Sequence, residues 1–521
     1  MKKVLLIVID SATGWVFERA LAEDRLPNFA ALVDAGEIRY DSVAVFPSIT
    51  PAATSSIATG RYPVEHGIAG NYWFDADDNS LVYYGSDIPA ILNHGLGSYF
   101  EDFLVSFNHH RLSAPTIFHT VEAAGRISAC LNFLIFNGPH PHDVVVPPLV
   151  EILPGVELSK TVYGPTILSL GVLVKPQLPN ADEPLDVLDG PLHKFGFDDE
   201  NSAVLLRQML EQRALPDFTL AYFPDYDGAC HAQGPWDALP TLEKIDGFLG
   251  ELFAAHGGLD ALLADVCIAL SGDHAQCDIV DDDSAGILLN DLLPGFTVAK
   301  AGVTADQMND DDDLIVCPNL RLAQLYVREP AADRCANRDE LADLLLADAR
   351  IDQAFWRTQD DDRRWIYHVS TRDRGNLQFR RAAADEDSPA DVYGCRWQWT
   401  GDLRAVDGHV DGDIITFGDY PNAFERIVGF LDLHSSGDLV LTAHPGYEFQ
   451  VAGTSVHTGG GSHAALHRVD SLSPILLAGA PAGIHLPDHP RTVDLAPLCL
   501  QVLDLEPAFL PGTSHVNFQP D

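Results

Sequence analysis

The first hydrophobic segment of the chain predicts a strand that is buried on both faces of a sheet. Residues 4–9 form an unbroken run of aliphatic side chains that stops at Asp10. Such runs are typical of parallel sheets covered by helices on both sides. Similar short runs recur at 127–133, 218–223, 266–270, 439–442 and 475–477.

Segments with helical periodicity alternate with these runs. They lie at 26–36, 116–125, 205–213, 239–255 and 493–503. Strands that alternate with amphipathic helices predict an α/β fold with a mostly parallel, doubly wound sheet.

The alternation changes between about 300 and 425, where short strand-like pieces such as 365–369 and 396–399 follow one another. We interpret residues 300–425 as an inserted, smaller α+β subdomain. The core is then discontinuous and consists of residues 1–299 and 426–521, with the last hundred residues completing the main sheet.

The charge of the chain excludes some partners. Lys and Arg number 32 against 76 Asp and Glu, which gives a net charge of −44 over 521 residues. This charge repels a nucleic acid duplex and an anionic membrane surface. No apolar run is long enough for a transmembrane helix, and no cleavage site follows the N-terminal run, so we expect a soluble cytoplasmic enzyme. The eight cysteines show no C-x-x-C pair and are expected to be reduced.

Metal-binding residue types follow three of the predicted strands. These residues are Asp10, then Asp225, Asp227 and His231, and then Asp273 and His274, while a glycine-rich loop near the end adds His463. The carboxyl ends of parallel strands meet at one edge of a sheet, so these side chains are expected to lie together. Mixed aspartate and histidine sets suit zinc or a similar first-row metal ion.

Thr50 is a candidate nucleophile at a predicted helix start. It precedes Pro51, and we expect it to be the N-cap of the following helix. The N-terminus of a helix favours a bound anion, so this hydroxyl is well placed to attack a phosphorus atom. A threonine hydroxyl is a poor nucleophile unless a metal lowers its pKa, which connects Thr50 to the predicted metal ligands.

With these motifs the chain resembles the alkaline phosphatase superfamily, nearest its type I phosphodiesterase/nucleotide pyrophosphatase branch. The motifs that carry the resemblance are Asp10 after a buried strand, Pro47-Ser48-Ile49-Thr50, Thr59-Gly60, Pro63-Val64-Glu65-His66-Gly67-Ile68, Asn71, Asp227-x-x-x-His231, Ser271-Gly272-Asp273-His274 and Ser462-His463. The resemblance implies an alkaline-phosphatase-like α/β/α sandwich. It leaves 300–425 and parts of 145–200 uncovered.

The resemblance also implies roles for individual residues. Two divalent ions are expected, most simply Zn²⁺, although Mn²⁺ or Fe would accept the same ligands. One ion would be held by Asp227, His231 and His463, and the other by Asp10, Thr50, Asp273 and His274. Asn71 and the backbone amide of Thr50 would bind a non-bridging phosphoryl oxygen.

Three details of the sequence depart from the family or stay open. Ala275 and Ala464 replace glycines that are usual in the family. Asp225 competes with Asp227, which we prefer because it keeps the four-residue step to His231. Residues 72–74, Tyr-Trp-Phe, are either a platform for an aromatic group or part of the core.

The expected function is hydrolysis of small phosphodiesters by in-line attack of metal-activated Thr50, through a phospho-threonine intermediate. Three aspartates and a Thr50 alkoxide balance two divalent cations, which suits a monoanionic diester. A phosphomonoesterase or phosphonate monoester hydrolase of the same superfamily is the alternative, and a silent metal-binding protein is the alternative outside enzymes. A sulfatase and a mutase are disfavoured because their nucleophile motifs are absent. The physiological substrate and the oligomeric state are not indicated by the sequence.

Overall fold

A seven-stranded sheet forms the centre of the molecule. The computed structural model describes residues 2–76, 78–85, 101–145, 159–299, 308–309, 311–335, 337–383, 385–452 and 454–514. The strand order is β2 (Gly36–Val43), β25 (Leu472–Ala478), β10 (Val266–Gly272), β1 (Lys3–Ile9), β9 (Phe218–Phe223), β5 (Ser128–Leu131) and β8 (Ile167–Ser169).

The central sheet is mostly parallel, as the sequence predicts. β1 pairs in parallel with β9 and β10, and β5 pairs in parallel with β8 and β9. Only β25 runs in the opposite direction to its neighbours in this sheet. Side chains of β1 alternate between two hydrophobic clusters, so that both faces of the strand are buried.

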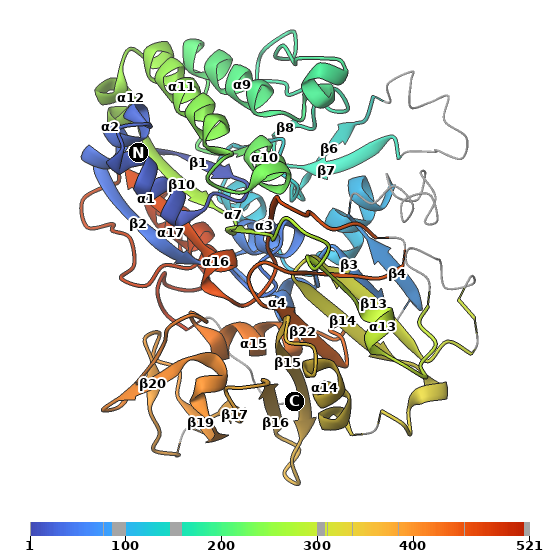
Figure 1. Ribbon diagram of the computed structural model, residues 1–521. Helices are drawn as coiled ribbons and strands as arrows, with labels where there is room; N and C mark the ends of the chain where they lie inside the picture. Colours follow the sequence, from blue (N-terminus) through green and yellow to red (C-terminus); the bar gives the residue numbers. More distant parts are fainter. Residues whose placement is uncertain are drawn as a thin grey trace.

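Helices cover both faces of this sheet and give the α/β/α arrangement (Figure 1). One face packs against α1 (Gly14–Ala22), α2 (Pro27–Asp34), α9 (Asp199–Glu211), α11 (Leu239–His256) and α12 (Leu259–Asp265). The other packs against α3 (Thr50–Thr59), α7 (Ile117–Ala123) and α17 (Leu495–Val502). The helices predicted from periodicity are confirmed within a few residues, apart from the start of the segment at 205–213, which begins earlier as α9.

A second, antiparallel sheet lies beyond α3 and α17 (Figure 1). Its order is β13 (Leu314–Asn319), β14 (Leu322–Val327), β22 (Leu439–Ala443), β15 (Ile351–Gln359), β16 (Trp365–Ser370), β17 (Asn376–Arg381) and β19 (Trp397–Gly401). Helices α14 (Arg338–Leu346) and α15 (Ala423–Leu431) accompany it.

The position of β22 corrects one expectation. Residues after 425 were expected to complete the central sheet, and β25 does so, but β22 lies between β14 and β15 in the second sheet. A short aliphatic run fits the middle of either sheet, so its composition cannot decide the partner. The division into residues 1–299 with 426–521 and an insertion at 300–425 stays a prediction.

Smaller elements connect and edge the two sheets. The helices among them are α4 (Pro63–His66), α10 (Asp225–Gln233), α13 (Leu289–Leu292), α16 (Arg468–Ser471) and the π-helix at Asp102–Arg111. The paired strands are β3 (Tyr72–Asp75) with β4 (Ser80–Tyr83), β6 (His140–Asp143) with β7 (Thr161–Gly164), β11 (Cys277–Asp278) with β24 (Gly461–Ser462) and β12 (Gly286–Leu288) with β23 (Glu448–Gln450). A small sheet consists of β18 (Ala390–Asp391), β21 (Ile414–Phe417) and β20 (Gly408–Asp411). All eight cysteines are unpaired and buried. Among the described helices, none has the length and the apolar character needed to cross a membrane.

A buried ion pair joins the second sheet to the segment before β25. Arg321, in the turn between β13 and β14, pairs with Asp470 of α16, and neither side chain is exposed. The same guanidinium donates to the carbonyl of Ala443, at the end of β22, at 2.8 Å. Asp470 also accepts from the backbone amide of Ala465 at 2.7 Å. The pair therefore fixes the second sheet against the chain that leads into the central one.

We expect Arg321→Met to lower the free energy of unfolding by about 3–5 kcal/mol, because Asp470 would stay buried without its cation. Chemical denaturation measures the change. Arg364→Met is the matched control, since Arg364 pairs with Asp360 at the surface, and it should change the free energy by less than about 0.5 kcal/mol. Equal effects of both variants would contradict a special role for the buried pair.

Candidate active site

The polar residues that follow the strands of the central sheet meet at one edge of it. Asp10 follows β1, and Asp273 and His274 follow β10. Asp227 and His231 lie on α10, which follows β9 after one residue, Pro224. Because β9, β1 and β10 are adjacent and parallel, their carboxyl ends bring these five residues together, as the sequence predicts.

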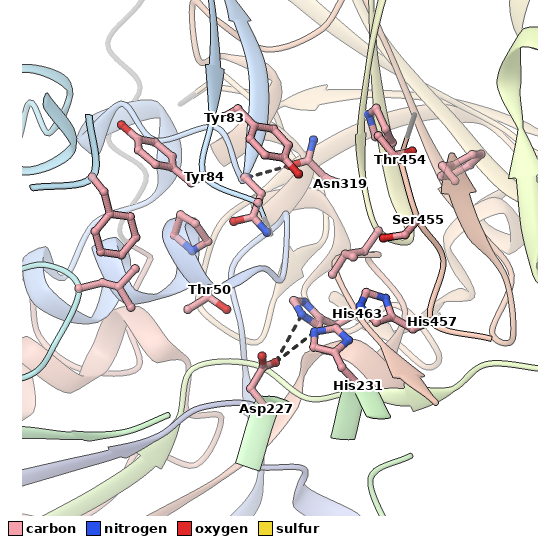
Figure 2. A pocket seen from close by; sticks show the side chains of 18 residues that line it. Thr50, Tyr83, Tyr84, Asp227, His231, Asn319, Thr454, Ser455, His457 and His463 are labelled. Carbon is pink, nitrogen blue, oxygen red and sulfur yellow. Dashed lines mark hydrogen bonds and ion pairs between the residues drawn. The ribbon is translucent and has the colours of Figure 1, made fainter. Parts of the chain in front are cut away.

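Thr50 and His463 reach the same place from other parts of the chain. Thr50 is the first residue of α3, and its Oγ1 lies 3.0 Å from Nε2 of His274. His463 follows β24, and its Nδ1 lies 3.0 Å from the carbonyl oxygen of Ser48, two residues before Thr50. Figure 2 shows the Thr50 hydroxyl beside Asp227 and the two histidines His231 and His463.

The start of α3 corrects a second expectation. Thr50 does not cap the helix, because the N-cap is Ile49, which is extended at φ −139° and ψ 143°, and no side chain caps this end. Thr50 is the first residue of the helix, and Pro51 is the second. The hydroxyl of Thr50 therefore makes no capping hydrogen bond and faces His274.

Two groups of Asp and His side chains have the spacing of metal ligands. One consists of Asp227, His231 and His463, and the other of Asp10, Asp227 and His274. Within each group the ligand atoms lie within 4.8 Å of one another. The first group is the set implied by the family resemblance. The second differs from the implied set in containing Asp227.

Asp273 lies beside the second group. Its Oδ1 accepts from the backbone amides of Ser11 at 3.0 Å and His274 at 2.9 Å. Its Oδ2 has no hydrogen-bond partner and lies 3.6 Å from Nε2 of His274. One oxygen of Asp273 is therefore left to face a cation, which keeps it a candidate ligand.

His231 and His463 turn the same ring nitrogen, Nε2, toward Asp227. Nδ1 of His231 lies 2.8 Å from the carbonyl oxygen of Gly461, as Nδ1 of His463 does from that of Ser48 at 3.0 Å. Nε2 of these rings lies 3.4 Å and 3.7 Å from Oδ1 of Asp227. A carbonyl at Nδ1 fixes the proton there and leaves Nε2 as a lone-pair donor, which is the usual arrangement of histidines that bind metals.

Asp227 is itself held by two polar side chains. Its Oδ1 accepts from the hydroxyl of Ser11 at 2.6 Å and from Nε2 of Gln276 at 2.7 Å. Loss of solvent raises the pKa of Asp227, but His231, His274 and these two hydrogen bonds outweigh it and lower the pKa below its usual value. Asp227 is therefore a carboxylate at neutral pH.

Asp10 and Asp273 are acids for which the described part of the chain supplies no lysine or arginine partner. Both are buried, and Oδ1 of Asp10, like Oδ2 of Asp273, has no hydrogen-bond partner. Burial raises the pKa of Asp10, and Asp273 and Asp227 raise it further. Burial also raises the pKa of Asp273. Within the described residues, the ion pairs of all three aspartates go only to histidines.

This donor set fits divalent metal ions. Buried carboxylate oxygens without partners are costly unless a cation compensates them. Imidazole nitrogens aimed at the same point supply ligands that zinc and other first-row metals accept. The described side chains therefore have the donor chemistry of a metal site.

A cavity of about 250 Å³ opens above Thr50 and the first group of ligands. Asn71 and Thr50 both line it. Tyr83 and Tyr84 lie toward one side, while Thr454, Ser455 and His457 lie toward the other (Figure 2). A third aromatic residue, Phe103, also lines the cavity. The remaining lining residues are Pro51, Gly85, Leu134, Asp227, His231, Pro318, Asn319, Leu320, Phe449 and His463.

The structure decides two alternatives that the sequence leaves open. Asp225 lies outside both ligand groups; it pairs with Lys194 and accepts from the backbone amide of Asp199. Tyr72 and Trp73 are buried in the core and do not line the cavity.

Several pocket and supporting residues were missed by sequence reasoning. Ser11 and Gln276 stand next to or near predicted ligands along the chain, so their adjacency was a usable signal. Tyr83, Tyr84, Asn319 and His457 belong to segments that carry no motif, and only the fold brings them to the cavity.

Comparison with known proteins identifies the family and the fold of the chain. Ectonucleotide pyrophosphatase/phosphodiesterase 1 of Saccharomyces cerevisiae is 24% identical over 316 residues, which are 55% of this chain and 36% of that protein. The match thus spans about a third of the length of this curated relative.

Two solved structures share the fold over nearly their whole length. Murine ectonucleotide pyrophosphatase/phosphodiesterase 5, as an inactive variant in complex with AMP, superposes with a TM-score of 0.55 at 14% identity, covering 97% of this chain and 96% of that one. Phosphonoacetate hydrolase of Sinorhizobium meliloti, in complex with phosphonoformate, gives a TM-score of 0.54 at 15% identity, covering 96% of each chain.

The family itself is established by sequence. The model of the type I phosphodiesterase/nucleotide pyrophosphatase family matches residues 4–465, from the first strand to just beyond His463. The chain therefore belongs to the type I phosphodiesterase/nucleotide pyrophosphatase family of the alkaline phosphatase superfamily.

Proposed function

We propose that this protein is a two-metal phosphodiesterase that hydrolyses small phosphodiesters, with Thr50 as nucleophile. The observation that carries the proposal is the Thr50 hydroxyl at 3.0 Å from His274, between two overlapping groups of metal-ligand side chains. Family membership supports the reaction class.

The proposed ligands divide into two sets that share one edge of the central sheet. Asp227, His231 and His463 would hold one divalent ion, and Asp10, Thr50, Asp273 and His274 the other. Zinc suits these nitrogen and carboxylate donors best, and Mn²⁺ or Fe would accept them too. When bound, such ions lower the pKa of a hydroxyl or a water and neutralise charge on the phosphoryl group.

Thr50 would attack phosphorus in line with the leaving group. Its Oγ1 forms a bond to phosphorus as the bond to the leaving alcohol breaks, and the alcohol departs with a proton. A water then attacks the phospho-threonine, which returns the Thr50 hydroxyl and releases a phosphate monoester. Because Thr50 is the first residue of α3, its own backbone N–H would lie beside the transferred phosphoryl group.

Asn71 and the backbone amide of Thr50 would hold a non-bridging oxygen of that group. Asn71 lines the cavity beside Thr50. Donors fixed at this oxygen stabilise the charge that develops in the transition state, and each is worth about 10²–10³ in kcat in comparable sites.

The charges around the cavity favour a diester. Its described lining residues include no lysine or arginine, and Arg61, near the end of α3, pairs with Glu65. Three aspartates and an ionised Thr50 carry four negative charges, which two divalent ions balance. A diester adds one negative charge to this neutral site and a monoester dianion adds two, so the diester is the better fit.

The aromatic side of the cavity would accept one substituent of the diester. Tyr83, Tyr84 and Phe103 offer ring faces and edges on which a base or an aryl group can stack. The names of the curated relative and of the murine protein bound to AMP support a nucleotide-like substrate.

Replacing the nucleophile tests the mechanism. We expect Thr50→Ala to lower kcat with bis-p-nitrophenyl phosphate by about 10³-fold or more, because no other hydroxyl takes its place, while metal content and thermal stability change little. Thr59→Ala, at the far end of the same helix, is the control and should keep activity within about twofold. Substantial hydrolysis by Thr50→Ala would refute the assignment.

Removing a ligand tests the metal sites. We expect His463→Ala to lower the bound metal from two ions per chain toward one, measured by elemental analysis after dialysis, and a chelator to abolish hydrolysis by the parent protein. His142→Ala is the control, since His142 contacts the carbonyl of Pro165. An unchanged metal content in His463→Ala would make His463 a structural loop residue.

A pair of substrates tests the reaction class. On one preparation of known metal content, kcat/KM should be higher for bis-p-nitrophenyl phosphate than for p-nitrophenyl phosphate. A preference for the monoester would assign the protein to the phosphomonoesterases. Inactivity with both, despite two bound ions, would favour the silent metal-binding alternative.

A further inference from the structure

Asn319 of the second sheet holds the backbone of the segment that carries Asn71. It is the last residue of β13 and is buried. Its Oδ1 accepts from the backbone amide of Asn71 at 2.7 Å and from that of Tyr72 at 2.9 Å. Its Nδ2 donates to the carbonyl of Tyr72 at 2.7 Å and to that of Cys317 at 3.2 Å.

Two segments hold the backbone of Asn71: its carbonyl accepts from the amide of Tyr84 at 2.7 Å, beside the β3–β4 pair, and its amide donates to Asn319. Asn71 lies between α4 and β3, after Gly70, whose φ of +143° is strained for other residues. A Cβ at Gly70 would stand 2.6 Å from Oδ1 of Asn319. The segment is therefore pressed closely against the Asn319 amide, which only a glycine at position 70 allows.

We propose that Asn319 is a positioning residue, which sets the place of the Asn71 side chain in the oxyanion site through the backbone of residues 71 and 72. Figure 2 shows Asn319 at the wall of the cavity. This inference rests on the proposed function, in which Asn71 binds a phosphoryl oxygen.

Two features distinguish this role from an ordinary buried amide. Asn319 satisfies two consecutive amides at a point where the chain enters the cavity, so its loss leaves both free to move or to recruit water. Asn319 also lines the cavity itself, next to Leu320. The second sheet thereby contributes to the geometry of a site whose proposed nucleophile and metal ligands lie outside that sheet.

A double-mutant cycle tests the role. Asn71→Ala removes the proposed ligand to the phosphoryl oxygen but keeps its backbone amide, so Asn319 can still bind it. We expect Asn319→Ala to lower kcat/KM by roughly 10–100-fold in the parent protein, since a shift of about 1 Å in a reacting group has effects of this size. In the Asn71→Ala background the same change should cost less than about twofold.

Binding of inorganic phosphate to the metal-loaded protein provides a second readout that needs no turnover. Calorimetry should show that Asn319→Ala weakens phosphate binding about tenfold or more when Asn71 is present, and little when it is absent. A protein that fails to hydrolyse diesters but shows this coupling would refute the proposed reaction and leave the role of Asn319 standing. Absence of phosphate binding, or an equal loss of phosphate affinity with and without Asn71, would overturn the positioning role of Asn319.

Two further variants separate positioning from folding. Asn132→Ala is the control, because Asn132 is a buried amide whose hydrogen-bond partners Ser169, Gly171, Gly196 and Ser202 lie outside the cavity lining. It should change stability and leave kcat/KM within about twofold. If Asn319→Ala does not fold, Gly70→Ala displaces the same segment from Asn319, and it should show the same dependence on Asn71.

Discussion

The arrangement of this site depends on carboxylates placed where water cannot solvate them. Asp10 and Asp273 are buried beside His274 with one oxygen each unpartnered, and Asp227 lies close to His231 and His463. Such charges raise the free energy of the folded protein unless cations neutralise them. The ring nitrogens that point at the same place are donors that first-row metal ions accept. Metal binding at this place would therefore stabilise the fold.

The hydrogen bonds that hold these side chains come from distant parts of the chain. Ser11 and Gln276 hold Asp227, and the carbonyls of Ser48 and Gly461 set the rings of His463 and His231. Each contact links a ligand to a segment that comes from another strand or loop. The site is therefore rigid only when the whole central sheet and its C-terminal loops are assembled, and mutations outside the ligands can act on it.

The second sheet contributes residues to the wall of the cavity. The Arg321–Asp470 pair anchors it to the chain before β25, and Leu320 of the same turn and Asn319 line the cavity. The turn between β13 and β14 thus combines a structural anchor with residues that shape the substrate space. On the other side of the cavity lie Tyr83, the last residue of the β3–β4 hairpin, and Tyr84, which follows it. Variation in these two hairpins can change which substituents fit while the ligands stay the same.

The sequence by itself determined the central fold and the residues at its strand ends. Unbroken aliphatic runs predict buried parallel strands, and parallel topology brings their ends together, so Asp10, Asp227, Asp273 and His274 could be found without coordinates. The tertiary structure decided what periodicity cannot express: that β22 pairs within the second sheet, that Ile49 caps α3 in place of Thr50, and that Asn319, Tyr83 and His457 reach the cavity. These outcomes depend on contacts between segments far apart in the chain, and a local sequence pattern does not specify which distant segment it will contact.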